Sequence, residues 1–176
     1  MIVWVNGTHG VGKTTTSALL QPLLANARVF DAERVGEMLM DITPGLPATD
    51  NFQHWPPWRA LVVETARSVL EYAGGTLVVP MTVLVEGYWR EISDGLRAHG
   101  IPVRHVVLHA DEATLRDRIT GEHEVPSSFR LAHLRPYAQA ARTWLHESAT
   151  VVDTTGAPPA DVAARVAALC RRWSDQ

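Results

Sequence analysis

The sequence predicts an α/β fold in which a five-stranded parallel sheet lies between two layers of helices. The first observation is that five apolar runs of strand length alternate with longer segments of helical period. Such alternation is typical of βαβ units with buried, parallel strands. The second observation is the glycine-rich segment GTHGVGKT, which follows the first apolar run directly. The expected strands are residues 2–5, 27–30, 76–81, 103–109 and 149–154.

Seven helices are expected between and after these strands. They cover about residues 13–25, 33–41, 57–73, 88–99, 111–120, 130–146 and 159–173. The last helix has a narrow apolar stripe, which favours packing on the sheet over a membrane-surface helix. Residues 43–57, rich in proline, and 121–129 interrupt the pattern. Compact α/β proteins carry substrate and lid loops at such interruptions.

Length and composition limit the kind of protein that the chain can be. With 176 residues, 46% of them hydrophobic, we expect one domain over 1–176, with a substrate-binding region at about 43–60 and a lid at about 119–135. A net charge of -3 argues against nucleic acid as a partner. One cysteine, no leader pattern and no run of about 18 apolar residues predict a cytoplasmic protein without stable membrane insertion. The sequence does not show an oligomeric state.

The glycine-rich segment matches the phosphate-binding loop, or P-loop, pattern G-x-x-x-x-G-K-[ST]. Its context, after a strand and before a helix, is the one that the motif requires, and a chance match there is the rarer explanation. The backbone amides and the helix N-terminus would surround the phosphates of ATP. His9 lies inside the loop, where we expect its side chain to point outward without a catalytic role. The expected nucleotide-binding residues of the segment are Gly7, Thr8, His9, Gly10, Val11, Gly12, Lys13, Thr14 and Thr15.

Lys13 is the one lysine in a chain whose lysines and arginines together number 16. A compact ammonium group can reach between the β- and γ-phosphates, whereas the broader guanidinium group of arginine prefers a two-pronged contact. We therefore expect Lys13 to be catalytic. Thr14, the hydroxyl residue of the motif, would be a ligand of Mg²⁺.

Asp31 follows the second expected strand. Ligands of open parallel sheets gather at the carboxyl ends of the strands, so Asp31 is expected to face the γ-phosphate. Its carboxylate could then bind the acceptor and take the proton of the acceptor hydroxyl. The alternative is that Asp31 only caps the helix that begins at about residue 33.

Residues 111–119 read DEATLRDRI, and a polar stretch ending near Arg130 follows. This order is similar to the nucleoside and shikimate kinase superfamily, whose fold is a three-layer α/β/α P-loop NTPase fold. The resemblance implies that Arg118 lies beside the nucleotide and has a catalytic role. It also implies a lid arginine, for which Arg116, Arg130 and Arg135 are candidates; pairing of Arg116 with Glu112 on a solvated helix is the alternative.

One further segment adds to this resemblance, and another departs from it. The DTTG segment at 153–156 resembles the loop that passes the adenine in these kinases, which makes Thr155 a candidate nucleotide contact, although an ordinary turn explains it equally. The third expected strand runs into VVPMT, without the acid that usually holds the water shell of Mg²⁺. Either Asp31 serves the metal too, or metal binding is weaker and turnover slow.

Three stretches together resemble the bacterial tunicamycin resistance protein family: IVWVNG at 2–7, DNFQHWPPWRA at 50–60 and VVPMT at 78–82. The second and third are far more particular than the P-loop. The resemblance implies an ATP-binding protein that protects bacteria from tunicamycin, a nucleoside antibiotic composed of uracil, sugars and a fatty acyl chain.

The candidate residues for binding the acceptor lie in the stretches 50–60 and 78–82 and at the end of the second expected strand. Aromatic rings beside two prolines offer stacking surfaces for a base or a sugar, and polar side chains could add contacts. Tryptophans that only anchor a helix in the core are the alternative. The candidates are Asp31, Phe52, Gln53, Trp55, Trp58, Arg59, Met81 and Thr82.

The sequence therefore predicts a phosphotransferase that uses ATP and Mg²⁺ to phosphorylate a hydroxyl of tunicamycin or a similar small-molecule nucleoside antibiotic. Two alternatives stay open. The first is a protein that sequesters the drug in a nucleotide-dependent way without chemistry, which the missing third-strand acid favours. The second is a housekeeping kinase of a sugar or a shikimate-like acid.

Overall fold

Five parallel strands form one sheet in the order β2-β3-β1-β4-β5. The structure is a computed structural model that describes residues 1–121 and 128–174. The strands are β1 (Ile2–Asn6), β2 (Ala27–Val29), β3 (Thr76–Pro80), β4 (Val103–His109) and β5 (Thr150–Asp153). All five lie within a residue or two of the ranges expected from the sequence. The expected five-stranded parallel sheet is confirmed.

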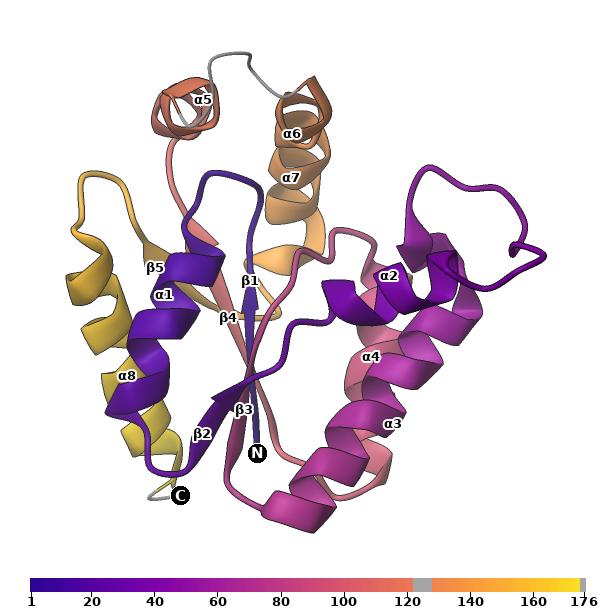
Figure 1. The fold of residues 1–176 in the computed structure, drawn as a ribbon. Helices are drawn as coiled ribbons and strands as arrows, with labels where there is room; N and C mark the ends of the chain where they lie inside the picture. Colours follow the sequence, from indigo (N-terminus) through magenta and orange to yellow (C-terminus); the bar gives the residue numbers. More distant parts are fainter. Residues whose placement is uncertain (122–127, 175–176) are drawn as a thin grey trace.

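Helices cover both faces of this sheet (Figure 1). On one face α1 (Lys13–Leu20) packs against α8 (Pro159–Ser174), and on the other α3 (Pro56–Ala73) packs against α4 (Glu86–Ala98). The three-layer arrangement is thus confirmed as well. Within residues 1–121 and 128–174, no helix is both long and apolar enough to cross a bilayer.

The remaining helices lie toward the carboxyl ends of the strands. Figure 1 shows α5 (Glu112–Gly121), α6 (Ser128–Ala132) and α7 (Leu134–Ala140) beyond that end of the sheet, and α2 (Glu33–Met40) beside it. A short 3₁₀ turn, η2 (Phe52–His54), leads into α3. These elements surround the end of the sheet where ligands of parallel α/β proteins bind.

Proline accounts for the two helices that end earlier than the sequence pattern indicated. The helix expected at 13–25 stops at Leu20 and gives way to a 3₁₀ turn, η1 (Gln21–Leu23), which contains Pro22. The helix expected at 130–146 divides into α6, α7 and the π-helical segment η3 (Ala141–Leu145). Pro136, in the first turn of α7, cannot donate to the carbonyl four residues earlier, so the helix does not run through from α6.

The central strand β1 is buried along its whole length, which fixes the start of the P-loop. It pairs with β3 on one side and β4 on the other, with Trp4 opposite Val79 and His105. The Trp4 indole donates to the carbonyl of Met81 at 3.1 Å, and its ring meets Trp89 edge-on at 5.4 Å. A fully packed strand holds the loop that follows it in one position.

His105 of β4 is buried opposite Trp4 of the neighbouring strand β1. Its Nε2 accepts from the Asn6 amide at 3.2 Å, its Nδ1 faces the Ser148 hydroxyl at 3.4 Å, and its ring stacks on Trp89 at 3.9 Å. Burial lowers the pKa of His105 from 6.5 to about 4. Protonation of Nε2 would place an N–H group against the N–H donor of the Asn6 amide. The hydrogen bond between Asn6 and His105 is therefore lost when His105 is protonated in acid.

We expect His105 to make folding sensitive to mild acid. Its pKa is lower in the folded than in the unfolded chain, so its contribution is complete above pH 6.5 and is lost as the pH falls toward about 4. In wild type, protonation of His105 alone should lower the free energy of unfolding by about 2 kcal/mol between pH 7 and pH 5. Urea denaturation at both pH values should show a smaller loss for His105→Gln. An equal loss in both proteins would contradict the assignment.

A candidate site of two adjoining cavities

Asn6 anchors the P-loop to the segment that follows β3. Its Oδ1 accepts from the backbone N–H groups of Gly7 at 2.8 Å and Val83 at 3.0 Å, and its Nδ2 donates to the Val83 carbonyl at 2.9 Å. Thr82 adds a hydroxyl bond to the Gly7 carbonyl at 2.7 Å. Asn6 was not predicted as a site residue; the signal in the sequence was its place between the apolar run 2–5 and the glycine-rich segment.

The loop itself bends at glycines that no other residue could replace without strain. Gly10 has φ +75°, and a Cβ on it would lie 2.9 Å from the Ile119 side chain and 3.1 Å from the Leu115 carbonyl of α5. Gly12, with φ +93°, is the N-cap of α1. The positive φ angles direct successive amide groups toward one side of the loop, as a phosphate-binding loop requires.

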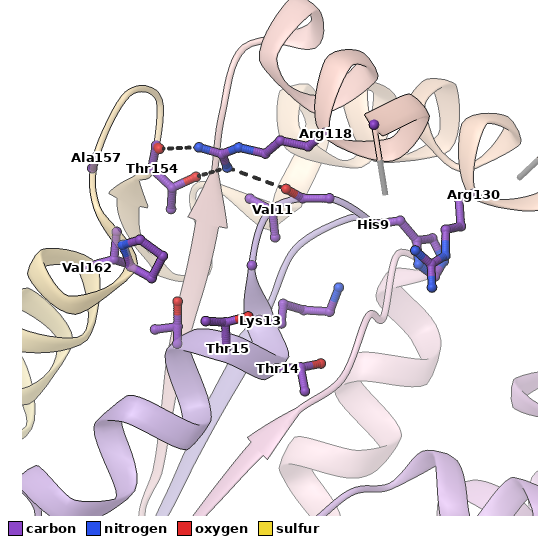
Figure 2. Close-up of a pocket in the computed structure, with 15 residues that line it drawn as sticks. His9, Val11, Lys13, Thr14, Thr15, Arg118, Arg130, Thr154, Ala157 and Val162 are labelled. Atoms are coloured by element: carbon purple, nitrogen blue, oxygen red, sulfur yellow. Dashed lines mark hydrogen bonds between the residues drawn. The ribbon is translucent and has the colours of Figure 1, made fainter. Parts of the chain in front are cut away.

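A cavity of about 530 Å³ lies over this loop (Figure 2). The Lys13 ammonium group donates to the Thr8 carbonyl at 2.9 Å, so its side chain folds back across the loop. The cavity wall contains most of the expected P-loop residues and parts of α5, α6 and α8. Its lining residues are His9, Gly10, Val11, Gly12, Lys13, Thr14, Thr15, Thr16, Arg118, Gly121, Arg130, Thr154, Ala157, Pro159 and Val162.

Arg118 joins the P-loop to the loop between β5 and α8. Figure 2 shows its guanidinium group donating to the Thr154 carbonyl at 2.8 Å, the Thr154 hydroxyl at 3.2 Å and the Gly10 carbonyl at 3.4 Å. Arg118 also lines the cavity over the P-loop. Thr155 lies differently: its hydroxyl accepts from the Asp111 N–H at 3.1 Å, and Thr154 lines the cavity in its place.

The expected lid at 119–135 includes residues 122–127, which lie outside the described part of the chain. Of the three candidate lid arginines, Arg130 of α6 lines the nucleotide cavity. Arg116 instead pairs with Glu112 at 2.9 Å on α5, the alternative that its spacing had left open. Arg135 is exposed on α7 and is not among the residues that line this cavity.

A second cavity, of about 450 Å³, adjoins the first on the side of α2 and η2. We call it the acceptor cavity, because residues expected from the sequence to contact an acceptor line it. His9 and Arg130 line both cavities, so the two spaces meet beside the P-loop. The other lining residues are Glu33, Asp50, Asn51, Phe52, Gln53, Met81, Thr82, Leu84, Val85, Phe129, His133 and Pro136.

Four of the predicted acceptor residues therefore lie together in this cavity: Phe52, Gln53, Met81 and Thr82. The Gln53 amide donates to the Thr82 carbonyl at 2.7 Å. That bond ties η2 to the chain after β3. Residues far apart in the sequence thereby form one wall.

Three other predicted residues are not among those that line this cavity. Trp58 has no exposed surface, packs 5.4 Å from Phe52 and donates to the Ala32 carbonyl at 3.0 Å. Buried Arg59 donates to the Gln53 carbonyl and pairs with Glu91, and Trp55 donates to the Pro47 carbonyl at 2.9 Å. Trp58 and Arg59 are therefore buried at the start of α3, as the alternative of a helix anchor requires, whereas Trp55 is half-buried.

Two carboxylates follow β2, and they differ in where they lie. Asp31 accepts from the Glu33 N–H at 3.0 Å and lies 3.7 Å from Arg34, and it does not line either of the two cavities as described. Glu33, the first residue of α2, does line the acceptor cavity. Although the Glu33 side chain is exposed, desolvation and then the charge of Asp31 raise its pKa, while Lys13 opposes the shift. A raised pKa suits a general base.

The described residues fit a bound nucleotide better than they fit a fully coordinated metal. The glycine bends, the Lys13 ammonium group and the cavity volume suit a nucleoside triphosphate. Thr14 lines the cavity and offers one hydroxyl ligand to Mg²⁺. At the carboxyl end of β3, where P-loop enzymes usually carry an acid, Thr82 instead donates its hydroxyl to the Gly7 carbonyl.

The strand order, the P-loop and the adjoining cavities define a nucleotide-binding protein with a P-loop kinase-like fold. The chain belongs to the AAA domain family, whose model matches residues 2–143. No curated protein sequence matches the chain significantly.

Solved structures give the same fold. The tunicamycin resistance protein of Deinococcus radiodurans has a TM-score of 0.79 and 27% sequence identity, over 96% of this chain and 94% of that one. A sugar kinase from Janibacter sp. has a TM-score of 0.67 at 18% identity, over 94% and 91%. A gluconokinase from Sinorhizobium meliloti has a TM-score of 0.63 at 18% identity, over 98% and 96%. The two kinases bear on the fold alone.

Proposed function

We propose that the protein is an ATP- and Mg²⁺-dependent phosphotransferase that phosphorylates a hydroxyl of tunicamycin or a similar nucleoside antibiotic. The observation that carries the proposal is the meeting of the two cavities at His9 and Arg130, beside the P-loop. A phosphoryl group held by the loop would then adjoin the space for an acceptor. The likeness to a tunicamycin resistance protein supports the choice of acceptor.

In the proposed reaction, the acceptor oxygen bonds to the γ-phosphorus of ATP while the bond from that phosphorus to the β,γ-bridging oxygen breaks, which releases ADP. The loop amides and Lys13 hold the phosphates, and Arg118 fixes the β5–α8 loop beside them. Arg130 offsets the charge on the transferred group. When bound at Thr14, Mg²⁺ supplies charge neutralisation at the phosphate oxygens.

The proton of the acceptor hydroxyl goes to a carboxylate, and we assign this role to Glu33 in place of Asp31. Glu33 lines the acceptor cavity, whereas Asp31 serves the backbone N–H of Glu33 and so helps to hold the start of α2. Asp31 is then a positioning residue. The Asp-Ala-Glu spacing at the end of β2 left both carboxylates available in the sequence.

The lining of the acceptor cavity favours an uncharged acceptor with apolar surface. Phe52, Met81, Leu84 and Val85 offer apolar contacts, and Asn51 and Gln53 lie among them. Of the lining residues described, Arg130 is the cation, while Glu33 and Asp50 are acids. An acidic sugar derivative would meet more negative than positive charge, which argues against a housekeeping kinase of such an acid.

Sequestration without chemistry is the second candidate, and one observation favours it. The chain after β3 presents Thr82 and no acid, so Mg²⁺ would have fewer protein ligands than in other P-loop enzymes. Weak metal binding would slow transfer while leaving nucleotide and drug binding intact.

Mass spectrometry of tunicamycin after incubation with the protein, ATP and Mg²⁺ tests the proposal. We expect the drug to gain the mass of one phosphoryl group, and Lys13→Ala to form this product at least about 10²-fold more slowly. Unmodified drug that binds only in the presence of nucleotide would establish sequestration. Absence of drug binding under all conditions would contradict both candidates.

A further inference from the structure

A cluster of three aromatic rings lies where the two cavities meet. The His9 ring contacts His133 edge-on at 5.0 Å and Phe129 at 5.7 Å, and Phe129 and His133 lie 4.5 Å apart. His9 comes from the P-loop, Phe129 from α6 and His133 from the residue between α6 and α7. The cluster therefore joins the phosphate loop to the segment that carries Arg130.

We infer that His9 is a positioning residue, whose ring holds α6 so that Arg130 faces the phosphate end of both cavities. The inference rests on the proposed function, because it needs a nucleotide bound at the P-loop. It differs from the sequence expectation, in which His9 pointed outward. In the structure, His9 and Arg130 lie together at one side of the cavity (Figure 2).

The local contacts explain how a ring contact can orient Arg130. The His133 Nδ1 donates to the Phe129 carbonyl at 2.8 Å, so these two residues bracket the turn of α6 that contains Arg130. Phe129 keeps 57% of its surface accessible, and its ring contacts that of His9 in the P-loop. An edge-to-face pair of rings supplies direction as well as apolar contact.

The electrostatic surroundings keep His9 suited to this role. Burial, followed by the charges of Lys13, His133 and Arg130, lowers the pKa of His9 to about 3. At neutral pH the ring is therefore uncharged and does not repel Arg130. A phenylalanine could make the same ring contacts, whereas an alanine could not.

The test compares the affinities of the protein for AMP-PNP and ADP by isothermal titration calorimetry with Mg²⁺. AMP-PNP has the terminal phosphoryl group that Arg130 would face, and ADP lacks it. We expect His9→Ala to weaken AMP-PNP binding by about 3- to 10-fold, the range of one or two lost ring contacts, and to change ADP binding by less than about 2-fold. His9→Phe should restore AMP-PNP binding.

A double-mutant cycle with Arg130→Ala shows whether His9 acts through Arg130. If it does, His9→Ala should cause no further loss of AMP-PNP affinity in the Arg130→Ala protein. Equal weakening of AMP-PNP and ADP, additive losses in the double variant, or failure of His9→Phe to restore affinity would each overturn the inference. If the wild-type protein binds neither nucleotide, the proposed function fails. The other outcomes overturn only the role of His9 and leave the proposed function standing. Thermal unfolding of each variant verifies that it is folded.

Discussion

Lys13→Ala should lower kcat/KM for phosphoryl transfer by at least about 10²- to 10³-fold, the typical cost of removing one preorganised donor to a developing charge. The side chain starts at the first residue of α1 and returns over the loop to the Thr8 carbonyl, so its ammonium group lies within the nucleotide cavity. Lys13 is the only lysine of the chain, so no neighbouring lysine can take its place. The measurement is product formation at saturating ATP and varied acceptor concentration.

Lys13→Arg is the matched control for this prediction. It keeps the positive charge but changes its shape, and we expect most of the loss to persist because a guanidinium group is planar and broader than an ammonium group. Circular dichroism should show both variants folded, since the Lys13 side chain is not part of the buried core. Activity of Lys13→Ala near that of wild type would remove the P-loop from the mechanism.

Glu33→Gln should lower kcat by about 10²- to 10⁴-fold, the range attributed to general base catalysis. The amide keeps the size of the side chain but cannot take the acceptor proton. The pKa of Glu33 is raised, so in wild type the rate should increase with pH around a higher midpoint than that of an ordinary carboxylate. Glu33→Gln should lack this increase of rate with pH. A pH profile of kcat/KM checks both points.

Asp31→Asn is the control that separates the two carboxylates. Its Oδ1 can still accept from the Glu33 N–H, so we expect a loss of less than about 10-fold. The reverse pattern, with Asp31→Asn inactive and Glu33→Gln active, would reinstate Asp31 as the base. Similar, small losses in both variants would exclude a carboxylate base at the end of β2.

The P-loop and the sheet could be predicted from sequence because their signals are local. A buried run such as Ile2–Asn6 has a strand pattern by itself, and the glycines with Lys13 and Thr14 have fixed spacing. Burial of whole strands then leaves few ways to arrange them, so the fold follows. Proline effects inside helical patterns, as at Pro136, explain the boundaries that the periodicity missed.

The walls of the cavities were harder to predict because a shift of one or two positions along the chain changes where a side chain points. Thr154 lines the nucleotide cavity and Thr155 does not, and Glu33 lines the acceptor cavity while Asp31 does not. The aromatic residues near 50–60 show the same limit. Phe52 reaches the cavity, but Trp58 belongs to the core, and composition alone does not distinguish them.

His9 shows a third kind of limit. Its neighbours Phe129 and His133 lie more than a hundred residues away in the sequence, and only the fold brings them to the P-loop. Long-range contacts of this kind have no periodicity or spacing that a single sequence could reveal.

If the two adjoining cavities carry out phosphoryl transfer, each protein molecule should turn over many times, and these turnovers can be counted. Tunicamycin in large molar excess over the protein, with ATP and Mg²⁺, should yield phosphorylated drug in amounts that exceed the protein many times, with one ADP formed for each product. If protection of the drug stops at one molecule per protein and no phosphorylated product forms, the protein sequesters tunicamycin and the catalytic account is wrong.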